Sequence, residues 1–243
     1  MSSIIITQPM FFPWVGLLEQ IKYSDILVIY DDVDYSKGSF VNRVQLKLES
    51  KKTWLTVPLS KVKLGDKINE VRIDAKSEWK KKHLSILESA FKDTTYYPEV
   101  MGIVNEVHSD ISNSLVDVSF KSMIELCNFF DLIKNKEVCF SSELNIPGTS
   151  SRRVLDVVKY FSADQYITGH GALKYLDHEE FEFNGIDVMY VDYALKKYPQ
   201  KYGCFDPYVS SLDLMANCGF GGCEYIDPVM VDWKTFMKRK GVL

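Results

Sequence analysis

The stretch IIITQPMFFPWVGLLEQIKYSDILVIYDD, which runs from Ile4 to Asp32, decides the fold. Its first four residues, Ile4–Thr7, are mostly apolar and β-branched and predict a short buried strand. After a loop with two prolines, Gly16–Ile21 has helical spacing, and the apolar run Ile26–Tyr30 predicts a second buried strand. Strand, helix and strand in this order indicate a βαβ unit with parallel strands.

Strands and helices alternate again in the last third of the chain. A helix is predicted for SRRVLDVVKYF (151–161), a strand for QYITG (165–169), a short helix for ALKYLD (172–177) and a strand for FEFNGIDVMYVDY (181–193). Two further strands are predicted for KKTWLTVPLS (51–60) and INEVRID (68–74). We therefore expect an α/β fold in which helices flank a mostly parallel sheet.

The middle of the chain, residues 77–133, has helical periodicity and no strand pattern. It starts at Ser77, which suits an N-cap, and a polar join near Ser109–Ser114 divides it. We expect a single α/β domain over residues 1–243, in which residues 77–133 form a helical layer, a subdomain or a lid.

The composition excludes several classes of protein. A chain of 243 residues that is 46% hydrophobic and 26% charged is globular rather than disordered. Its net charge of -4 argues against a nucleic-acid-binding protein. No run approaches the roughly 20 apolar residues of a membrane span, and no signal peptide precedes the first strand, so we expect a cytoplasmic protein. The five cysteines form no C-x-x-C pair, so we predict no metal site.

Polar residues follow both strands of the βαβ unit. A right-handed crossover places the carboxyl ends of parallel strands at one edge of the sheet, where α/β proteins bind ligands. Gln8 has an amide that suits a ligand, Trp14 can stack on a base or sugar, and Gly16 lets the helix approach the loop. Asp31 or Asp32 could orient an amine or bind Mg²⁺. The alternative is that the loop aromatics only cap the core.

Two stretches carry residues suited to anions. In FVNRVQ, Asn42 precedes Arg43, which can hold a phosphate or carboxylate through two hydrogen bonds. In PGTSSRRV, Ser151, Arg152 and Arg153 stand on the first turn of a helix, where backbone amides favour anions. The spacing of a Walker loop is absent. A solvated ion pair for Arg43 and simple capping by Ser151 are the alternatives.

Two further groups of polar residues are candidates for the site. Gly169 and His170 follow a predicted strand, where the glycine permits close approach of a ligand and the histidine could act as acid or base. The alternative for His170 is a surface residue. A loop too long for a simple connection then leads into a helix. This loop and helix carry the candidate binding residues Tyr198, Gln200, Ser211 and Asp213.

Five of these stretches together resemble the WbqC-like protein family. They are QPMFFPWVGLLEQIKYSDILVIYDDVDYSKGSFVNRVQLK (8–47), WLTVPL (54–59), YITGHGALKYLDHEEFEFNGIDV (166–188), YPQ (198–200) and SSLDLMANCG (210–219). The resemblance implies a role in bacterial O-antigen, lipopolysaccharide or other surface-polysaccharide biosynthesis, where some members acylate or aminoacylate an amino sugar. It therefore implies a nucleotide-linked amino sugar as ligand. The family usually has His-Gln-Pro at the strand end, whereas Thr7 precedes Gln8 here. If that histidine is the family's catalytic base, this chain is impaired or uses another group.

The opening also resembles nucleotidylyltransferases and pantothenate synthetase, which adenylate a carboxylate at a strand-to-helix loop, although their paired histidines are absent. This likeness implies ATP and Mg²⁺ as cofactors of a ligase that activates glycine or another small acid as an acyl-adenylate for attack by the sugar amine. Arg43, Arg152 or Arg153 would stabilise the phosphate charge. An acyl-CoA-dependent N-acyltransferase and a noncatalytic nucleotide-sugar binding or scaffold protein stay open as alternatives. The acyl group, the sugar, the catalytic base and the oligomeric state stay open too.

Overall fold

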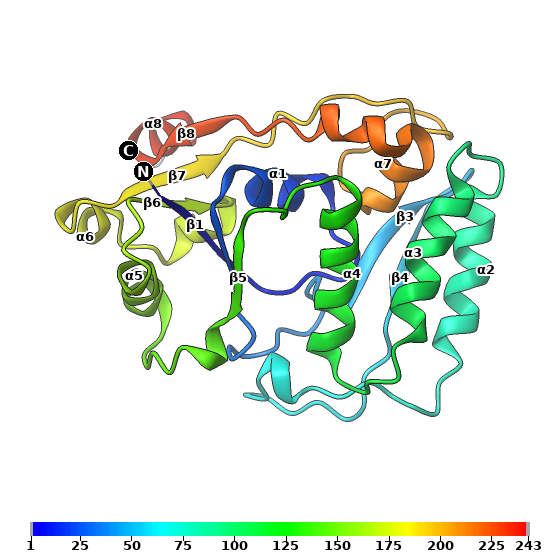
Figure 1. The fold of residues 1–243 in the computed structure, drawn as a ribbon, viewed down its shortest axis with the longest axis horizontal. Coiled ribbons are helices and arrows are strands. Elements are labelled where there is room, and N and C mark those ends of the chain that lie inside the picture. Colours follow the sequence, from blue (N-terminus) through cyan, green and yellow to red (C-terminus); the bar gives the residue numbers. More distant parts are fainter. Residues whose placement is uncertain (1, 242–243) are drawn as a thin grey trace.

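A six-stranded sheet with the order β5-β2-β1-β6-β7-β8 is the larger sheet of the computed structural model, which describes residues 2–241, and it lies on one side of the molecule (Figure 1). Five strands run parallel, and β8 pairs antiparallel to β7. The α/β fold with a mostly parallel sheet is therefore confirmed. The strands are β1 (Ser3–Thr7), β2 (Ile26–Ile29), β5 (Glu137–Phe140), β6 (Gln165–Thr168), β7 (Asp187–Val191) and β8 (Met230–Asp232).

The sheet is wound in two directions from β1. The chain passes through α1 (Val15–Tyr23) to β2 and later reaches β5 on the same side of β1. It then crosses back through α5 (Ser150–Tyr160) to β6 on the other side, and through α6 (His178–Phe183) to β7. The connections of the neighbours β1 and β6 thus leave in opposite directions. A crevice forms outside the carboxyl ends of such strands.

The two faces of the sheet are covered by different layers. Ile4 and Val28 pack on the side of α5, α6 and α8 (Trp233–Arg239), whereas Ile5 and Leu27 belong to the core on the side of α1. Alternate residues of a strand point to opposite faces, so both faces of β1 and β2 are buried. This explains why these two strands read as continuous apolar runs.

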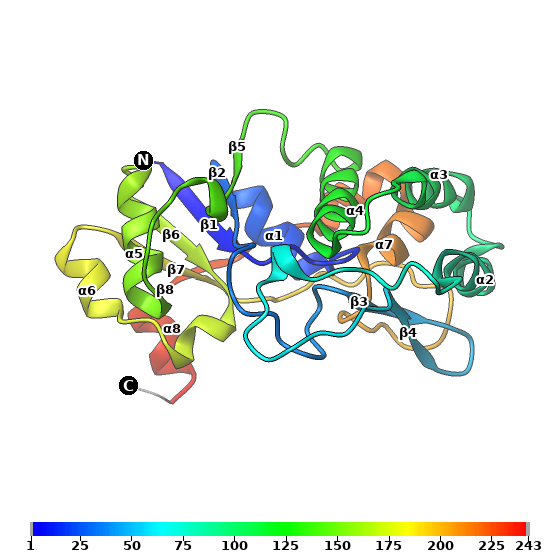
Figure 2. The same cartoon turned by 90° about the horizontal axis from the view of Figure 1, so that it is seen from below.

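A second lobe lies beside the sheet (Figures 1 and 2). In it, the antiparallel hairpin of β3 (Arg43–Lys47) and β4 (Lys52–Thr56) is grouped with four helices. These are α2 (Trp79–Phe91), α3 (Tyr97–Ser109), α4 (Leu115–Phe129) and α7 (Ser211–Cys218). Residues 77–133 supply three of them and so form the expected helical layer, while their separation as a subdomain or lid stays a prediction. No helix within residues 2–241 is long and apolar enough to cross a membrane.

Several local predictions are corrected by the structure. INEVRID is not a strand, because Ile68–Glu70 is a 3₁₀ turn, η1, and the residues after it make only isolated bridges. The first residues of FEFNGIDVMYVDY belong to α6, which ends at Phe183 before Gly185 at φ 73°. The segment ALKYLD begins inside a 3₁₀ helix, η3 (His170–Lys174). The remaining 3₁₀ helices are η2 (Ser141–Glu143) and η4 (Gly219–Tyr225).

Candidate functional site

A cleft of about 890 Å³ opens at the carboxyl ends of β1, β2 and β6. Residues that follow these strands line it, among them Gln8 after β1, Tyr30 and Asp32 after β2, and Gly169 after β6. It therefore occupies the point where the winding of the sheet reverses, which is where open α/β sheets bind ligands. Of the predicted site residues, this cleft brings together Gln8, Trp14, Asp32, Arg153, Gly169 and His170.

One side of the cleft is an aromatic wall made of Trp14, Tyr193 and Tyr208. The ring centroid of Trp14 lies 4.8 Å from that of Tyr193 and 5.7 Å from that of Tyr208. Gly16 does not line the cleft but fixes this wall, because a Cβ there would overlap the indole of Trp14. Aromatic faces of this kind bind bases and the apolar faces of sugars by stacking.

The hydroxyl group of Tyr193 is fixed inside the cleft. It accepts a 2.7 Å hydrogen bond from Nε2 of Gln20, so its own proton is free to be donated to a ligand. A side chain at Gly169 would overlap this hydroxyl. The backbone of Tyr193 has φ 25°, a strained value for an aromatic residue, and such strain persists where packing enforces it, often at functional sites. Burial and the nearby Glu19 raise the pKa of Tyr193, so it serves as a hydrogen-bond donor.

His170 opens η3 at the edge of the cleft. Its ring lies 4.7 Å from that of Tyr193 and 4.8 Å from that of Phe236. The Nε2 atom is buried and has no hydrogen-bond partner among residues 2–241. Burial lowers the pKa of His170, with Lys240 adding to the effect, and so favours the neutral imidazole. A neutral imidazole with an unused nitrogen can accept a proton.

A second part of the cleft, its charged end, is formed by Arg153 and Asp32. The guanidinium of Arg153 donates to Asp32 through Nη2 and, at 2.9 Å, to the Ile146 carbonyl through Nε, and it lies 5.0 Å from the ring centre of Tyr30. Ser141 donates to Asp32 at 2.6 Å. Burial alone would raise the pKa of Asp32, but the hydrogen bonds from Arg153 and Ser141 outweigh it and hold the pKa below its usual value.

Asp31 lies behind this charged end and does not line the cleft. Its carboxylate accepts hydrogen bonds from the Ser142 amide at 3.0 Å and hydroxyl at 2.7 Å, from Ser141 at 3.1 Å and from Asn69 at 3.2 Å. These bonds join the ends of β2 and β5 to η1 and so position Asp32. A catalytic role for Asp31 stays a prediction.

The N-terminus of α5 faces the cleft through Gly148, Thr149 and Ser150. The helix has no acidic residue in its first turn, and Arg153 stands one turn in. Free amides at a helix start, together with a cation, favour phosphate. Neighbouring Ser151 is buried and accepts a hydrogen bond from the Asp177 amide at 2.8 Å. Arg152 is exposed and ion-paired, at 3.2 Å to Asp156 and 2.7 Å to Glu180.

The polar side chains of the cleft suit binding of phosphate oxygens better than they suit binding of a metal ion by the protein itself. Its two carboxylates are already paired, Asp32 with Arg153 and Asp34 with Lys67. No group of three His, Cys, Asp or Glu side chains in the described part of the chain could hold a metal ion. Any Mg²⁺ here would have to be carried mainly by the phosphates of a nucleotide.

Three other predicted residues lie together in a buried polar group, the anchor cluster, formed by Lys47, Tyr198, Gln200 and Asp213. The Nζ of Lys47 donates to Gln200 Oε1 at 2.8 Å, and Gln200 Nε2 donates to the Tyr198 hydroxyl at 3.0 Å. Burial raises the pKa of Asp213 to about 6, although bonds from Tyr198 and Gln200 oppose it. The cluster fixes the loop 192–210, which carries Tyr193 and Tyr208 to the cleft.

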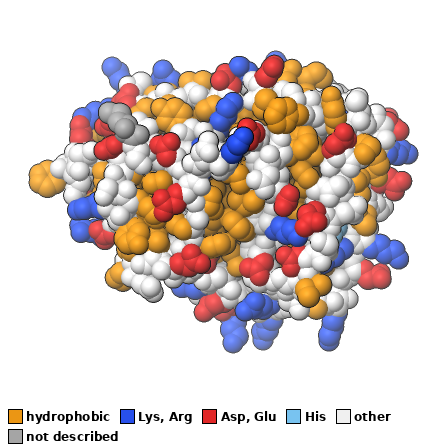
Figure 3. Space-filling model, in the orientation of Figure 1, with side chains coloured by type: hydrophobic (Ala, Val, Ile, Leu, Met, Phe, Trp, Pro, Cys, Tyr) orange, Lys and Arg blue, Asp and Glu red, His pale blue; other side chains and the backbone are white. Residues whose placement is uncertain are grey.

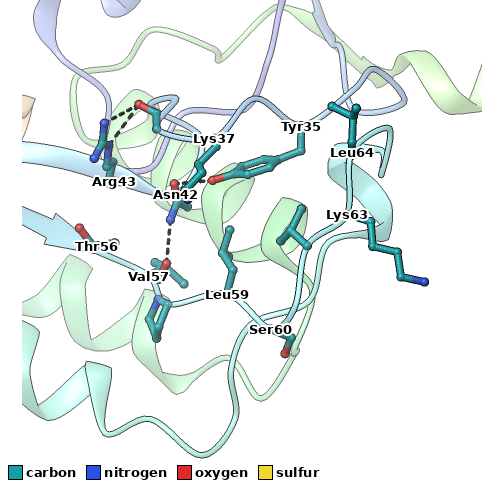
Figure 4. A pocket seen from close by; sticks show the side chains of 13 residues that line it. Tyr35, Lys37, Asn42, Arg43, Thr56, Val57, Leu59, Ser60, Lys63 and Leu64 are labelled. Carbon is teal, nitrogen blue, oxygen red and sulfur yellow. Dashed lines mark hydrogen bonds between the residues drawn. The ribbon is translucent and has the colours of Figure 1, made fainter.

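Ser211, the remaining residue of that region, supports the loop after β1. Its hydroxyl donates to the Pro13 carbonyl at 2.7 Å, and the Ser210 hydroxyl donates to the Phe12 carbonyl at 2.8 Å. Phe12 has φ 41°, so these bonds hold a strained corner of the backbone directly before Trp14. Asn42 and Arg43 line a different cavity (Figure 4).

The sequence did not point to Tyr193, Gln20 or Tyr208. Tyr193 stands two residues after β7, and the strand-end rule that selected Gly169 would have found it had the strand been bounded correctly. Gln20 is a buried polar residue on the mainly apolar helix α1, next to the buried Glu19, which is a usable signal. Tyr208 has no local signal, because only the path of the long loop brings it to the cleft.

These features define a doubly wound α/β protein with a cleft where the winding reverses. The sequence profile of the WbqC-like protein family matches residues 8–225, so the chain belongs to this family. The chain is 26% identical over 229 residues to "Uncharacterized protein Rv1507c" of Mycobacterium tuberculosis. The matched region covers 93% of this chain and 98% of that protein. No solved structure matches the chain.

Proposed function

We propose that this chain is an amide-forming enzyme of bacterial surface-polysaccharide biosynthesis, which attaches an acyl or aminoacyl group to the amino group of a nucleotide-linked amino sugar in the cytoplasm. One observation carries the proposal: a single cleft is lined both by an aromatic wall and by the N-terminus of α5 with Arg153. The first suits a base or a sugar ring, and the second suits a diphosphate.

Nucleic acid is a less suitable anionic partner. The net charge of the chain is -4, and on the face drawn in Figure 3 acidic side chains lie among the basic ones. Binding to a phosphate backbone needs a continuous positive surface. The cations of the cleft are instead few and fixed, as recognition of a small ligand requires.

Residues of the cleft support the proposed amide-forming step. The amine nitrogen of the sugar forms a bond to the acyl carbon, the leaving group departs with its bonding electrons, and the nitrogen loses a proton. In this proposal His170 Nε2, which has no hydrogen-bond partner among residues 2–241, would take that proton, and the Tyr193 hydroxyl would donate to the acyl oxygen as negative charge develops. Asp32 would orient the amine. ATP, with Mg²⁺ on its phosphates, would supply the activation of the acid.

The direct test is a reaction with purified chain, a UDP- or TDP-linked amino sugar, and either glycine with ATP and Mg²⁺ or acetyl-CoA without ATP. Mass spectrometry of the sugar product and release of AMP, ADP or free CoA distinguish the two donors. We expect amide product with one donor and its loss in His170→Ala. Product in neither mixture, from protein that binds the sugar nucleotide, would contradict the enzymatic proposal.

Thr7 favours a second candidate, a noncatalytic nucleotide-sugar binding or scaffold protein. Thr7 lines the cleft where the family usually has histidine, and its hydroxyl donates to the Gln8 carbonyl at 3.2 Å. A Thr7→His variant separates the candidates. Gain of turnover would identify a weakened enzyme, whereas continued inactivity with unchanged sugar-nucleotide binding would support the scaffold.

A further inference from the structure

A second cavity, of about 690 Å³, lies between the loop 33–40 and the segment 56–64 (Figure 4). Three cationic residues, Lys37, Arg43 and Lys63, are among its lining, and no Asp or Glu is. The other lining residues are mainly apolar and include Leu59 and Val62. An apolar cavity bordered by cations alone suits an apolar molecule with a negative charge.

The positive charge of this second cavity is not neutralised. Arg43 donates from Nε at 3.2 Å and from Nη2 at 2.7 Å to the Gly38 carbonyl, and its guanidinium lies 4.2 Å from the ring centre of Trp54. The side chains of Lys37, Arg43 and Lys63 make no ion pair with any residue in the range 2–241. Figure 4 shows Lys63 extending outward, so Lys37 and Arg43 are the cations near the cavity.

The wall of the cavity is held in place before any ligand binds. The Tyr35 hydroxyl donates to Asn42 Oδ1 at 2.9 Å, and Asn42 Nδ2 donates to the Val57 carbonyl at 2.9 Å. Asn42 is buried, and its own carbonyl accepts from the Val57 amide at 2.8 Å. A preformed wall lowers the entropy cost of binding a small molecule.

One loop separates the second cavity from the cleft. Val33, Asp34 and Phe40 line the cleft, whereas Tyr35 and Lys37 of the same loop line the cavity. Two ligands bound at the same time would therefore lie on opposite sides of residues 33–40.

We propose that the second cavity binds a small aliphatic carboxylic acid. The carboxylate lies at the end formed by Lys37 and Arg43, and the hydrocarbon body packs on Tyr35, Leu59 and Val62. The proposal that the cavity binds an acid depends only on the residues of the cavity and not on the proposed function. Its further identification as the acyl donor rests on the proposed function.

Calorimetric titration of octanoate into the full chain tests the claim, with octylammonium as a ligand of equal length and opposite charge. We expect saturable binding of one octanoate per chain and none of octylammonium. Lys37→Glu should weaken octanoate binding about tenfold or more, because it replaces attraction by repulsion. Lys61→Glu is the matched control, since Lys61 is exposed and does not line the cavity. Val62→Trp, which fills the cavity, should also abolish binding.

The claim is overturned if octanoate binding does not saturate, if octylammonium binds equally well, or if Lys61→Glu and Lys37→Glu weaken binding alike. Thermal unfolding of every variant shows that it is folded. Titration of a UDP-linked amino sugar into the same proteins separates the two proposals. Octanoate binding without sugar-nucleotide binding contradicts the proposed function and leaves the cavity assignment intact, and the reverse result overturns only the assignment.

Discussion

The hydroxyl of Tyr193 is the group through which the aromatic wall can make a polar contact with a ligand. Tyr193→Phe keeps the ring and removes this donor, so we expect sugar-nucleotide affinity to fall about threefold to tenfold, the value of one hydrogen bond. Calorimetric titration measures it. Tyr208→Phe is the matched control, because the Tyr208 side chain is 63% exposed. Equal losses in the two variants would show that the Tyr193 hydroxyl has no specific role.

Glu19 is a buried acid whose ionisation should make the stability of the chain depend on pH. It is 1% exposed in the middle of α1, one of its carboxylate oxygens has no hydrogen-bond partner among residues 2–241, and burial raises its pKa from 4.5 to about 7. The folded chain retains the proton that the unfolded chain has lost. Stability is therefore full below about pH 4.5, falls as pH rises to about 7, and stays reduced above it.

Glu19→Gln removes this pH dependence while keeping the size of the side chain. We expect the variant to be more stable than the parent at pH 8, by up to roughly 3 kcal/mol, and equally stable at pH 4. Urea unfolding at the two pH values measures the difference. Glu224→Gln, at an exposed position, should show no such change. A constant difference between the parent and Glu19→Gln at both pH values would refute the explanation.

At the scale of elements, the anchor cluster determines where the loop 192–210 lies. Lys47→Met keeps the aliphatic stem of the side chain. It removes the hydrogen bond that Lys47 donates to Gln200 and the positive charge near Asp213. We expect a loss of roughly 1–3 kcal/mol in unfolding free energy. We also expect weaker sugar-nucleotide binding, although Lys47 does not line the cleft, because Tyr193 and Tyr208 depend on this loop. Chemical unfolding and calorimetry test the two effects, and Lys51→Met, at an exposed position, is the control.

Two helices of the second lobe meet at a pair of histidines, of which His83 is buried and His108 is half-buried. His83 on α2 and His108 on α3 have ring centroids 5.6 Å apart, and both pack on Trp79. Burial lowers their pKa values from 6.5 to about 4 and about 3, with the charge of His83 adding to the effect on His108. The unfolded chain therefore binds protons that the folded chain does not, so unfolding free energy should decrease as pH falls from 6.5 to 4.

Urea unfolding between pH 7 and 4 checks this prediction. In His83→Phe the loss of stability on acidification should be smaller than in the parent. The variant should also be less stable at pH 7, because it loses the 2.9 Å contact of His83 Nε2 with the Thr56 carbonyl. His178→Phe is the comparison at a buried histidine outside the pair; burial also lowers the pKa of His178, whose Nε2 lies 2.7 Å from the Tyr190 hydroxyl, so this variant measures the effect of a single buried histidine. An unchanged slope in His83→Phe would rule out the histidine pair as the cause.

At the scale of the whole molecule, the sequence predicts the strands that are buried on both faces and misses those at the edges. β1 and β2 are continuous apolar runs, because layers cover both sides of the sheet. β5 and β8 lie at the two edges of the sheet, are short and partly exposed, and carry no alternation that would mark them. INEVRID shows the converse, since its pattern suits a strand but its backbone turns at Ile68–Glu70.

The residues of the candidate site divide in the same way, into those that a local sequence pattern marks and those that only contacts between distant segments bring to the cleft. Gln8, Asp32 and Gly169 were predicted because position at the carboxyl end of a parallel strand is readable from sequence. The contribution of Tyr208 depends on packing between distant segments, which no local pattern records. Tyr198 and Gln200 were predicted as binding residues from an unusual loop, and the structure places them in the anchor cluster beneath that loop.

The central claim is that the cleft at the reversal of the sheet binds a nucleotide-linked amino sugar. Calorimetric titration of UDP- and TDP-linked amino sugars into the parent chain, Trp14→Ala and Trp54→Ala tests it most directly. Trp14 lines the cleft and Trp54 does not, so the pair controls for loss of a tryptophan as such. We predict saturable binding to the parent and to Trp54→Ala, and a loss of about tenfold or more in Trp14→Ala. Absence of binding to the parent, or equal affinity in all three proteins, would contradict the claim.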